Sequence, residues 1–296
     1  MANFRRSHGG DGRSNRGLMR MLVYIVVLSM VLFLLFIWLQ NGFQSSENKI
    51  GVNYDLPEYV PSSPSGDLLL RENFALSYNK NTRQADWAAY ILSRNMLNSK
   101  KQEGRRDFQR DKQTGMNAPN PKDYSHSGYT RGHLVPAADM SFSEQSLQQT
   151  YLMSNISPQI RAFNGGIWRE LEEDSRDWAR KFKKIYIVTG PVFGRHDASI
   201  GDTGIRVPQS FYKVILDIDE PELKGIGFIL PNERSTQHLQ NYAVSIDSVE
   251  KVTGIDFFSN VFQFEKLESR LESKYDTSLW TFNEKWYQLR INQWNE

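Results

Sequence analysis

The chain has 296 residues, 39% of them apolar and 12% aromatic, which is enough for one large domain or two small ones around a packed core. Cysteine is absent, and this excludes disulfide bonds, a thiolate nucleophile and any cysteine-ligated zinc site. The formal net charge of +2 divides into +4 over residues 1–40 and −2 over the remainder, so phosphate binding by the body requires a local cluster rather than bulk charge.

The first element expected from the sequence is an apolar helix. Met21 to Leu39 is a run of nineteen residues without charge, interrupted among apolar and aromatic side chains only by Ser29. A helix of that length spans roughly 28 Å, close to the hydrocarbon thickness of a bilayer. The run is preceded by one acid, Asp11, and by all the basic residues of this part of the chain: Arg5, Arg6, Arg13, Arg16 and Arg20.

This pattern predicts a transmembrane anchor at residues 21–40. The excess of arginine before it favours a cytoplasmic tail over residues 1–20 and a soluble part on the periplasmic or extracellular side. A cleaved signal peptide is one alternative, although the apolar run is long and no small-x-small site follows it. A mitochondrial location is another, because an arginine-rich, acid-poor leader also fits an organellar protein. A buried core helix is disfavoured by an uninterrupted run so close to the terminus.

The rest of the chain divides into a linker and a domain. Serine, proline and glycine interrupt residues 41–67 and no apolar periodicity survives there, so we expect a linker, followed by a soluble domain over residues 68–296. Residues 85–97 leave helix and strand both open. Residues 104–116 indicate a basic, polar loop, and residues 143–155 are expected to be partly helical.

The second half of the domain mixes helices and strands. Residues 163–184 show the clearest amphipathic helix, with one apolar stripe formed by Ile167, Leu171, Trp178 and Phe182. Apolar runs rich in β-branched residues predict strands at residues 185–191, 211–217 and 225–230, and a late helix is expected over residues 261–275. Strands and helices without regular βαβ alternation favour an α+β domain with a largely antiparallel central sheet flanked by helices.

Chemistry is concentrated in one stretch, Tyr129-Thr130-Arg131-Gly132-His133-Leu134, followed by Asn155-Ile156-Ser157-Pro158-Gln159 and by Asn164. A neutral imidazole can take a proton from water, because its unperturbed pKa lies near neutrality. A guanidinium can hold phosphate oxygens in a bidentate fork. A carboxamide oxygen can bind a hard divalent cation that keeps most of its waters. The combination suits hydrolysis of a phosphodiester.

Among the five histidines, His133 has the most informative neighbours. Gly132 before it allows another group to approach the backbone closely, and an apolar segment follows it. A lone histidine is more often structural than catalytic, so the interpretation depends on these neighbours. His126 lies close to the motif, whereas surface positions are expected for His196 and His238.

A third pattern is the spacing of Asn164, Trp168 and Glu172, which are successively four residues apart. On a helix such positions share one face, so an amide, an indole and a carboxylate would line up. A helix cap followed by an exposed acid would give the same spacing.

Together these segments resemble the DNA/RNA non-specific endonuclease family, the ββα-metal (His-Me finger) group that includes secreted bacterial nucleases and mitochondrial endonuclease G. The family signature reads Asp-Arg-Gly-His, then Asn-Ile-x-Pro-Gln, an Asn nine residues after the first Asn, and a Glu eight further on. The flanking segments are similar as well: Ala85-Asp86-Trp87, Pro136-Ala137-Ala138-Asp139-Met140, Thr189-Gly190-Pro191, Val207-Pro208 and Thr253-Gly254-Ile255-Asp256-Phe257-Phe258. The resemblance covers residues 69–280.

The resemblance implies a role for each matching residue. His133 would be the general base that activates water, and Arg131 would contact the phosphate. Asn164 would be the direct protein ligand of one hydrated Mg²⁺, with Mn²⁺ as a possible substitute. Glu172 would orient the ion's water. Asn155 would help to position the histidine loop.

The family also uses an upstream arginine in an Arg-x-aromatic context, which Arg106 matches. It would stabilise transition-state charge, although Arg105 is adjacent. The one departure from the signature is Thr130, where the family usually has Asp. Threonine keeps a hydrogen-bonding oxygen and removes the negative charge, so a reduced rate or a changed metal preference would follow.

The sequence therefore predicts a membrane-anchored endonuclease that cleaves DNA and RNA to 5′-phosphorylated fragments, with a homodimer as a possible assembly. The alternative from another class is a membrane-anchored nucleic-acid-binding or uptake protein that keeps the fold with little turnover. Thr130 is the one feature in its favour. An inhibitor partner and the DNA or RNA preference are not determined by the sequence.

Overall fold

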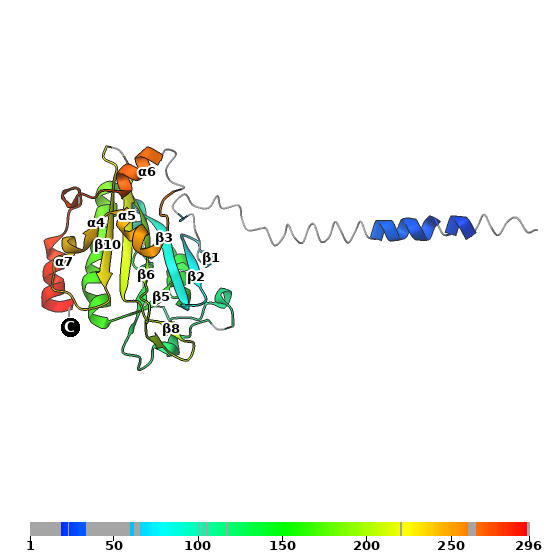
Figure 1. Cartoon of the computed structure of the whole chain (residues 1–296), viewed down its shortest axis with the longest axis horizontal. Coiled ribbons are helices and arrows are strands. Elements are labelled where there is room, and N and C mark those ends of the chain that lie inside the picture. The colour runs from blue at the N-terminus through cyan, green and yellow to red at the C-terminus, as the bar shows by residue number, and fades with distance from the viewer. Residues whose placement is uncertain are drawn as a thin grey trace, which may run out of the picture. The chain divides into compact units, whose positions relative to one another are not determined.

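The computed structural model describes residues 19–22, 24–33, 60–61, 66–99, 101–102, 104, 106–116, 118–219, 221–259 and 265–294. The chain divides into two compact units, Met1–Asp55 and Leu56–Glu296. Every element labelled in Figure 1 belongs to the second unit.

The first unit contains the segment expected to be a membrane anchor. Residues 19–22 and 24–33 are helical, and their side chains are exposed. Within the part of the chain that the structure describes, no helix combines the length and the apolar character that crossing a membrane requires. Residue 23 and residues 34–40 of the expected span lie outside the described ranges, and so do residues 41–59 of the expected linker.

The second unit is built on an antiparallel sheet, as the sequence predicts. Seven strands among the described residues pair in the order β1-β2-β3-β6-β9-β10-β11, and every pairing is antiparallel. Their bounds are β1 Asp67–Leu70, β2 Phe74–Asn79, β3 Gln84–Ser93, β6 Lys184–Val192, β9 Ser210–Asp217, β10 Lys224–Pro231 and β11 Ala243–Val244. The three strands predicted at residues 185–191, 211–217 and 225–230 are confirmed.

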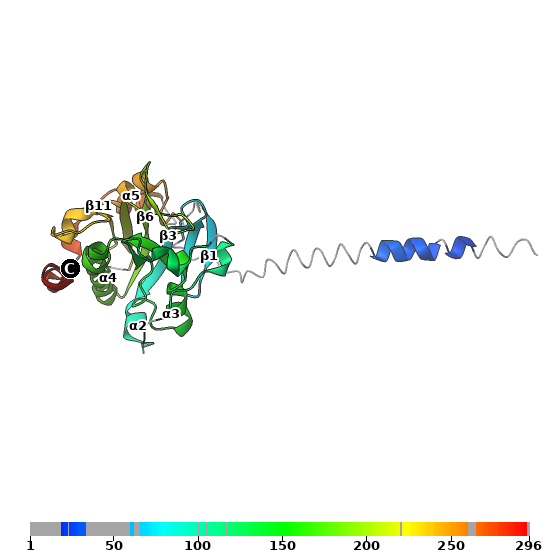
Figure 2. The ribbon, with the colours of Figure 1, turned by 90° about the horizontal axis from the view of Figure 1, so that it is seen from below.

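The sheet separates two apolar cores, because successive side chains of a strand point to opposite faces. On β9, Phe211 and Ile215 pack into one core, and Tyr212, Val214 and Leu216 pack into the other. Figure 2 shows α2 (Arg94–Asn98), α3 (Glu144–Thr150) and α4 (Arg169–Phe182) on one side of the sheet, and α5 (Ile246–Thr253) on the other. The α+β class with helices on both faces is therefore confirmed.

The remaining elements are short. Two small antiparallel pairs join β4 (Thr130–His133) to β5 (Ile156–Gln159), and β7 (Ser199–Ile200) to β8 (Ile205–Arg206). The C-terminal part contributes α6 (Glu265–Glu272), α7 (Glu284–Leu289) and a π-helical turn (Arg290–Trp294). The late helix expected over residues 261–275 is thus found as α6, and residues 261–264 lie outside the described ranges.

The segment left undecided at residues 85–97 contains both structures. β3 ends at Ser93, whose hydroxyl accepts a hydrogen bond from the backbone N–H of Met96 and so caps α2. Residues 143–155 are partly helical as predicted: α3 is followed by a 3₁₀ turn at Met153–Asn155.

The amphipathic helix expected over residues 163–184 needs a correction. The structure has a π-helical turn at Phe163–Trp168 and only then the regular helix α4. Gly166 breaks the regular geometry with φ −103° and ψ −113°. Asn164, Trp168 and Glu172 consequently do not share one continuous α-helical face, and Trp168 lies fully buried in the core.

Candidate active site

The central piece of the site is the two-stranded ribbon β4–β5, which carries the histidine at one end. Thr130 pairs with Gln159 and His133 with Ile156 across the antiparallel ribbon. Between them, a Cβ atom added to Gly132 would lie 2.0 Å from the Gln159 Oε1 atom, so a side chain at this position would clash. The close approach that the sequence predicts for Gly132 is confirmed.

The imidazole of His133 packs in a triangle with two aromatic rings, whose own centroids lie 5.2 Å apart. The Tyr151 ring lies edge-on at 5.0 Å from the imidazole centroid, with an interplanar angle of 84°. The Phe108 ring lies at 5.5 Å and is tilted by 42°. These two ring contacts limit the rotation of the imidazole, which is what a base of fixed direction requires.

Asn155 supports the backbone that follows the histidine. Its Oδ1 accepts a hydrogen bond from the Val135 N–H at 3.0 Å, and its Nδ2 donates to the Val135 carbonyl at 3.0 Å. Its own carbonyl accepts from the Leu134 N–H at 2.9 Å, and Nδ2 also donates to the Thr150 carbonyl at 3.0 Å. The side chain is fully buried, so these bonds fix the exit of β4 against the turn before β5.

Thr130 and Asn164 are joined by a hydrogen bond that the sequence could not reveal. The Asn164 Nδ2 donates to the Thr130 Oγ1 at 2.9 Å, and the Thr130 hydroxyl donates to the Gln159 carbonyl at 2.9 Å. The amide nitrogen is therefore committed to Thr130. The Asn164 Oδ1 accepts no hydrogen bond from any described residue.

Glu172, in the first turn of α4, is half-buried beside opposite charges. Burial raises the pKa of its carboxyl to about 7, while Arg176 and Lys213 oppose that rise. Lys213 lies fully buried on β9, on the face of the sheet that packs against α4. Burial lowers the pKa of its ammonium to about 8, and its Nζ lies 4.8 Å from the centroid of the Trp168 ring.

Lys213 is a site residue that sequence reasoning missed. A single lysine in a strand is usually solvent-exposed, and only its apolar neighbours in Phe-Tyr-Lys-Val-Ile-Leu indicate a buried position. Its Nζ makes no hydrogen bond within the described part of the chain, so its charge is balanced through space by the carboxylates around it.

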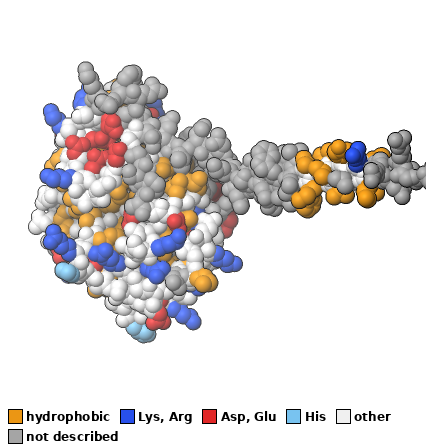
Figure 3. Space-filling model, turned by 45° about the vertical axis from the view of Figure 1, so that its right-hand side comes forward, with side chains coloured by type: hydrophobic (Ala, Val, Ile, Leu, Met, Phe, Trp, Pro, Cys, Tyr) orange, Lys and Arg blue, Asp and Glu red, His pale blue; other side chains and the backbone are white. Residues whose placement is uncertain are grey.

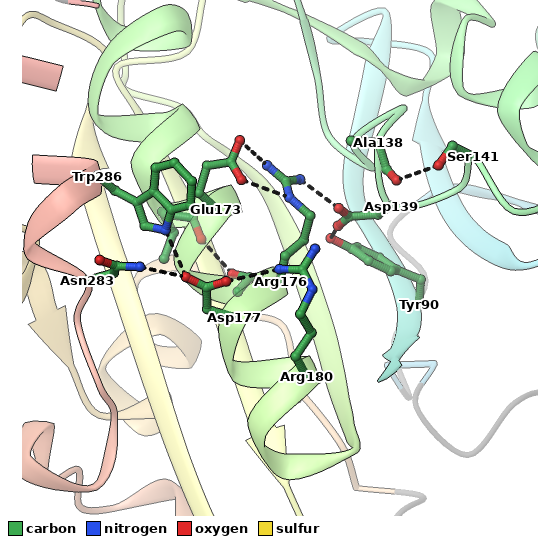
Figure 4. A network of polar contacts seen from close by, with 12 residues as sticks. Tyr90, Ala138, Asp139, Ser141, Glu173, Arg176, Asp177, Arg180, Asn283 and Trp286 are labelled. Atoms are coloured by element: carbon green, nitrogen blue, oxygen red, sulfur yellow. Dashed lines mark hydrogen bonds and ion pairs between the residues drawn. The ribbon is translucent and has the colours of Figure 1, made fainter. Parts of the chain in front are cut away.

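A buried ion-pair network centres on Arg176, four residues after Glu172 on α4 (Figure 4). Arg176 of α4 contacts Asp139 through Nη1 at 2.7 Å and Glu173 through Nη2 at 3.0 Å. The Tyr90 hydroxyl of β3 donates to the other Asp139 oxygen at 2.9 Å. The network ties α4 to the loop after His133 and to the central sheet, so the position of Glu172 relative to the histidine is fixed through Asp139.

The two arginines assigned from the sequence have different surroundings. The Arg131 Nε donates to the Pro121 carbonyl at 3.1 Å, and the guanidinium lies 5.4 Å from the Phe108 ring centroid and 5.8 Å from that of Tyr124. Arg131 forms no ion pair within the described residues. Arg106 instead donates to both carboxylate oxygens of Glu144, at 2.9 and 2.7 Å.

The structure therefore brings most of the expected residues onto one strand–strand–helix unit. β4 supplies Thr130, Arg131 and His133, and Asn164 and Glu172 follow β5 on the π-helical turn and α4. Arg106 is placed in an ion pair on the half-exposed surface. The surface positions expected for His196 and His238 are confirmed, because both are exposed, and His238 stacks on Tyr287 at 3.9 Å between ring centroids. His126, which lies close to the motif in sequence, is exposed as well.

Comparison with known proteins agrees with this geometry. The sequence matches the family described as DNA/RNA non-specific endonuclease over residues 55–264. A nuclease of Nostoc sp. is 34% identical over 230 residues, a match that covers 72% of this chain and 80% of that one. Mitochondrial endonuclease G of Homo sapiens is 30% identical over 205 residues, covering 64% of this chain and 69% of that one.

A solved structure is similar in fold as well as in sequence. A chain in the crystal structure of the EndoG/EndoGI complex matches with a TM-score of 0.64 and 26% identity, covering 68% of this chain and 89% of that chain. The family match spans more than two thirds of the sequence and includes the strand–strand–helix unit that carries the candidate site. The chain thus belongs to the DNA/RNA non-specific endonuclease family, a family of nucleases that hydrolyse phosphodiester bonds.

Proposed function

We propose that the chain is a metal-dependent, sugar-non-specific endonuclease that cleaves DNA and RNA to 5′-phosphorylated fragments. The observation that carries the proposal is the orientation of the Asn164 amide. The Asn164 Nδ2 donates a hydrogen bond to the Thr130 hydroxyl, so the Oδ1 atom is available to bind a cation. His133 lies three residues further along the same strand as Thr130, so the proposed base lies on the strand whose threonine holds the proposed metal ligand, Asn164.

The donor set fits a hard divalent cation. A neutral amide oxygen, with a half-buried carboxylate in the following helix, suits Mg²⁺, which keeps several waters and takes few protein ligands. Asn164 would hold the ion directly, and Glu172 would accept hydrogen bonds from its waters. When bound, the ion would supply Lewis-acid stabilisation of charge on the phosphate and on the leaving 3′ oxygen, and Mn²⁺ would substitute for Mg²⁺.

The chain's own residues would perform the other steps. His133 would take the proton from the attacking water, which requires a neutral imidazole. Arg131 would bind phosphate oxygens: Pro121 and the two aromatic rings hold its guanidinium, and its Nη1 has no hydrogen bond to any described residue. Arg106 would assist only after giving up its contact with Glu144.

This arrangement supports cleavage without base specificity. A cation and an arginine aimed at phosphate read no base edges, and they carry no information about sequence. We also propose that residues 21–40 attach the enzyme to a membrane with the nuclease domain outside the cytoplasm, on the strength of the apolar run and the arginines before it. A homodimer remains a sequence-based expectation.

The hydrogen bond between Thr130 and Asn164 also bears on the alternative of a nucleic-acid-binding protein with little turnover. Thr130 was the departure that favoured it, yet the threonine hydroxyl keeps the hydrogen bond that orients Asn164. This hydrogen bond supports the proposal of an active enzyme over that of a binding protein.

A digestion assay tests the proposal. The full-length chain, purified in detergent, is incubated with plasmid DNA or with structured RNA in Mg²⁺, Mn²⁺ or EDTA. We expect both substrates to be cleaved with either metal and neither in EDTA, and we expect new 5′ ends that accept radiolabelled phosphate only after phosphatase treatment. Tight binding of nucleic acid without cleavage in every metal would favour the uptake or binding protein instead.

A further inference from the structure

On the face of the sheet opposite the catalytic residues, three carboxylates converge between α5 and α6. Asp247 and Glu250 lie three residues apart on α5, and Glu272 is the last residue of α6. One oxygen from each carboxylate lies within 4.8 Å of the other two. Acidic side chains gather in one patch on the upper part of the domain in Figure 3, at the height where α5 and α6 lie in Figure 1.

Glu272 shows that this is more than an acidic surface. The residue is only 4% exposed, and its Oε1 has no hydrogen-bond partner among the residues that the structure describes. Carboxylates are rarely buried in this way unless a positive charge or hydrogen bonds compensate them. Within the described residues no Lys or Arg forms a salt bridge with Asp247, Glu250 or Glu272.

The charges around Glu272 make the lack of compensation more costly. The carboxylates of Glu250, Glu268, Asp247 and Asp256 lie close enough to repel a negative charge on Glu272. The Glu250 Oε1 accepts a hydrogen bond from the Phe257 N–H at 2.8 Å. A cation placed among these oxygens would remove the repulsion.

The two helices cannot easily move apart to relieve that repulsion. Each carboxylate has an apolar neighbour in sequence that is buried in the core on this face: Ile246, Val249 and Leu271. β10 meets them with glycines: a Cβ on Gly225 would lie 2.8 Å from both the Ile246 Cδ1 and the Leu271 carbonyl oxygen, and one on Gly227 would lie 2.8 Å from the Val249 Cγ2. Close docking on the strand therefore holds the carboxylates together.

We propose that Asp247, Glu250 and Glu272 form a structural calcium site that clamps α6 onto α5. All the donors are hard oxygens, which excludes a preference for soft transition metals. Three carboxylates converging on one point suit Ca²⁺, which accepts six to eight oxygen ligands in irregular geometry, better than Mg²⁺, which usually takes one or two carboxylates and keeps its waters. The partly open side of the site, at the exposed Asp247, would admit water to complete the coordination.

Calcium binding to the full-length chain in detergent, after removal of metals with EDTA, tests the site. Isothermal titration with Ca²⁺ alone is carried out on the parent, Asp247→Asn, Glu272→Gln and a surface control, Glu233→Gln. We expect at least a tenfold loss of Ca²⁺ affinity in the first two variants and none in the control. Asn164→Ala removes the proposed metal ligand of the candidate active site, so Ca²⁺ binding at the three carboxylates should persist in this variant.

Thermal unfolding provides a second readout that does not depend on activity. Saturating Ca²⁺ should raise the unfolding midpoint of the parent by several degrees, and it should have little effect on Glu272→Gln. Without metal, Glu272→Gln should unfold at the same temperature as the parent or higher, because the substitution removes repulsion. If Asp247→Asn and Glu272→Gln bind Ca²⁺ like the parent, or if Asn164→Ala abolishes all Ca²⁺ binding, the proposal is wrong.

Discussion

At position 130 a neutral threonine hydroxyl stands where the family signature usually has an aspartate, and it makes two hydrogen bonds. The hydroxyl donates to the Gln159 carbonyl and accepts from the Asn164 Nδ2, so both its donor and an acceptor position are used. A carboxylate could accept from Asn164 but could not donate to Gln159. The threonine therefore orients the Asn164 amide from within the ribbon without adding a negative charge.

Removing this hydroxyl should weaken metal binding more than it weakens the chemical step. Thr130→Val keeps the shape and frees the Asn164 amide to turn, so we expect an apparent Mg²⁺ affinity about 10- to 100-fold lower, with much of the rate restored at high Mg²⁺. Thr130→Ser keeps the hydroxyl and serves as the matched control. The cleavage rate as a function of Mg²⁺ concentration distinguishes them, and identical curves for parent and Thr130→Val would contradict the positioning role.

Restoring the family residue should have only a modest effect. Thr130→Asp adds charge near the cation and loses the bond to the Gln159 carbonyl, so we expect a higher rate or a changed metal preference within about tenfold, or roughly 1.4 kcal/mol. The ratio of the Mg²⁺ and Mn²⁺ rates is the measurement. A parent that shows no cleavage beside a strongly active Thr130→Asp would mean that threonine disables the enzyme.

At the scale of elements, the ribbon β4–β5 depends on the absence of a side chain at Gly132. Gly132→Ala would bring a methyl group against the buried Gln159 side chain, and we expect destabilisation by about 1–3 kcal/mol with loss of activity. The double variant Gly132→Ala with Gln159→Ala makes room for that methyl group. Denaturant unfolding of the parent, the two single variants and the double variant should show coupling, and purely additive effects would rule out this contact.

Helix α4 carries a second titrating group, Asp174, at its contact with the segment before α7. The Asp174 Oδ1 accepts a hydrogen bond from the Asn283 N–H at 3.1 Å, whereas Oδ2 is buried and has no hydrogen-bond partner in the described part of the chain. Burial raises the pKa of Asp174 to about 8, so the folded state holds a proton that the unfolded state has lost. The free energy of unfolding should therefore fall as the pH rises from about 4 to about 8.

Asp174→Asn should remove that part of the pH dependence. The variant keeps an acceptor for the Asn283 N–H and cannot ionise. Its free energy of unfolding should therefore change between pH 5 and pH 8 by at least about 1 kcal/mol less than that of the parent. Denaturant unfolding at the two pH values gives the comparison, and Asp202→Asn on the exposed surface is a suitable control. Equal pH dependence in parent and Asp174→Asn would show that Asp174 is ionised in the folded state.

The sequence predicted the elements whose patterns are local. The β-branched run before Gly190 indicated β6, and the signature residues indicated His133 and Asn164. The π-helical turn was missed because helical periodicity continues through residues 163–184 while Gly166 changes the backbone. Lys213 was missed because its burial depends on Trp168 and α4, which contact it only in the folded chain. The bond between Thr130 and Asn164 joins residues 34 positions apart and has no local signal.

At the scale of the whole molecule, the apolar residues 21–40 predict that the chain is attached to a membrane with its C-terminus outside the cytoplasm. If they form an uncleaved anchor, the full-length chain should remain with membranes after carbonate extraction. A reporter fused after Glu296 should be active only outside the cytoplasm. A variant with two arginines placed inside the apolar run is the control and should be released. A soluble mature form that starts near residue 41 would instead show that the segment is a cleaved signal.

The most direct test of the account compares single-turnover cleavage by His133→Ala and Asn164→Ala over a range of Mg²⁺ concentrations. His133→Ala should lower the rate by roughly two to four orders of magnitude at every Mg²⁺ concentration, because the base is lost while metal and substrate still bind. Asn164→Ala should be equally slow at low Mg²⁺ and partly recover at high Mg²⁺, because its defect lies in holding the ion. Parent-like cleavage by His133→Ala, or full activity of the parent in EDTA, would contradict the proposed site.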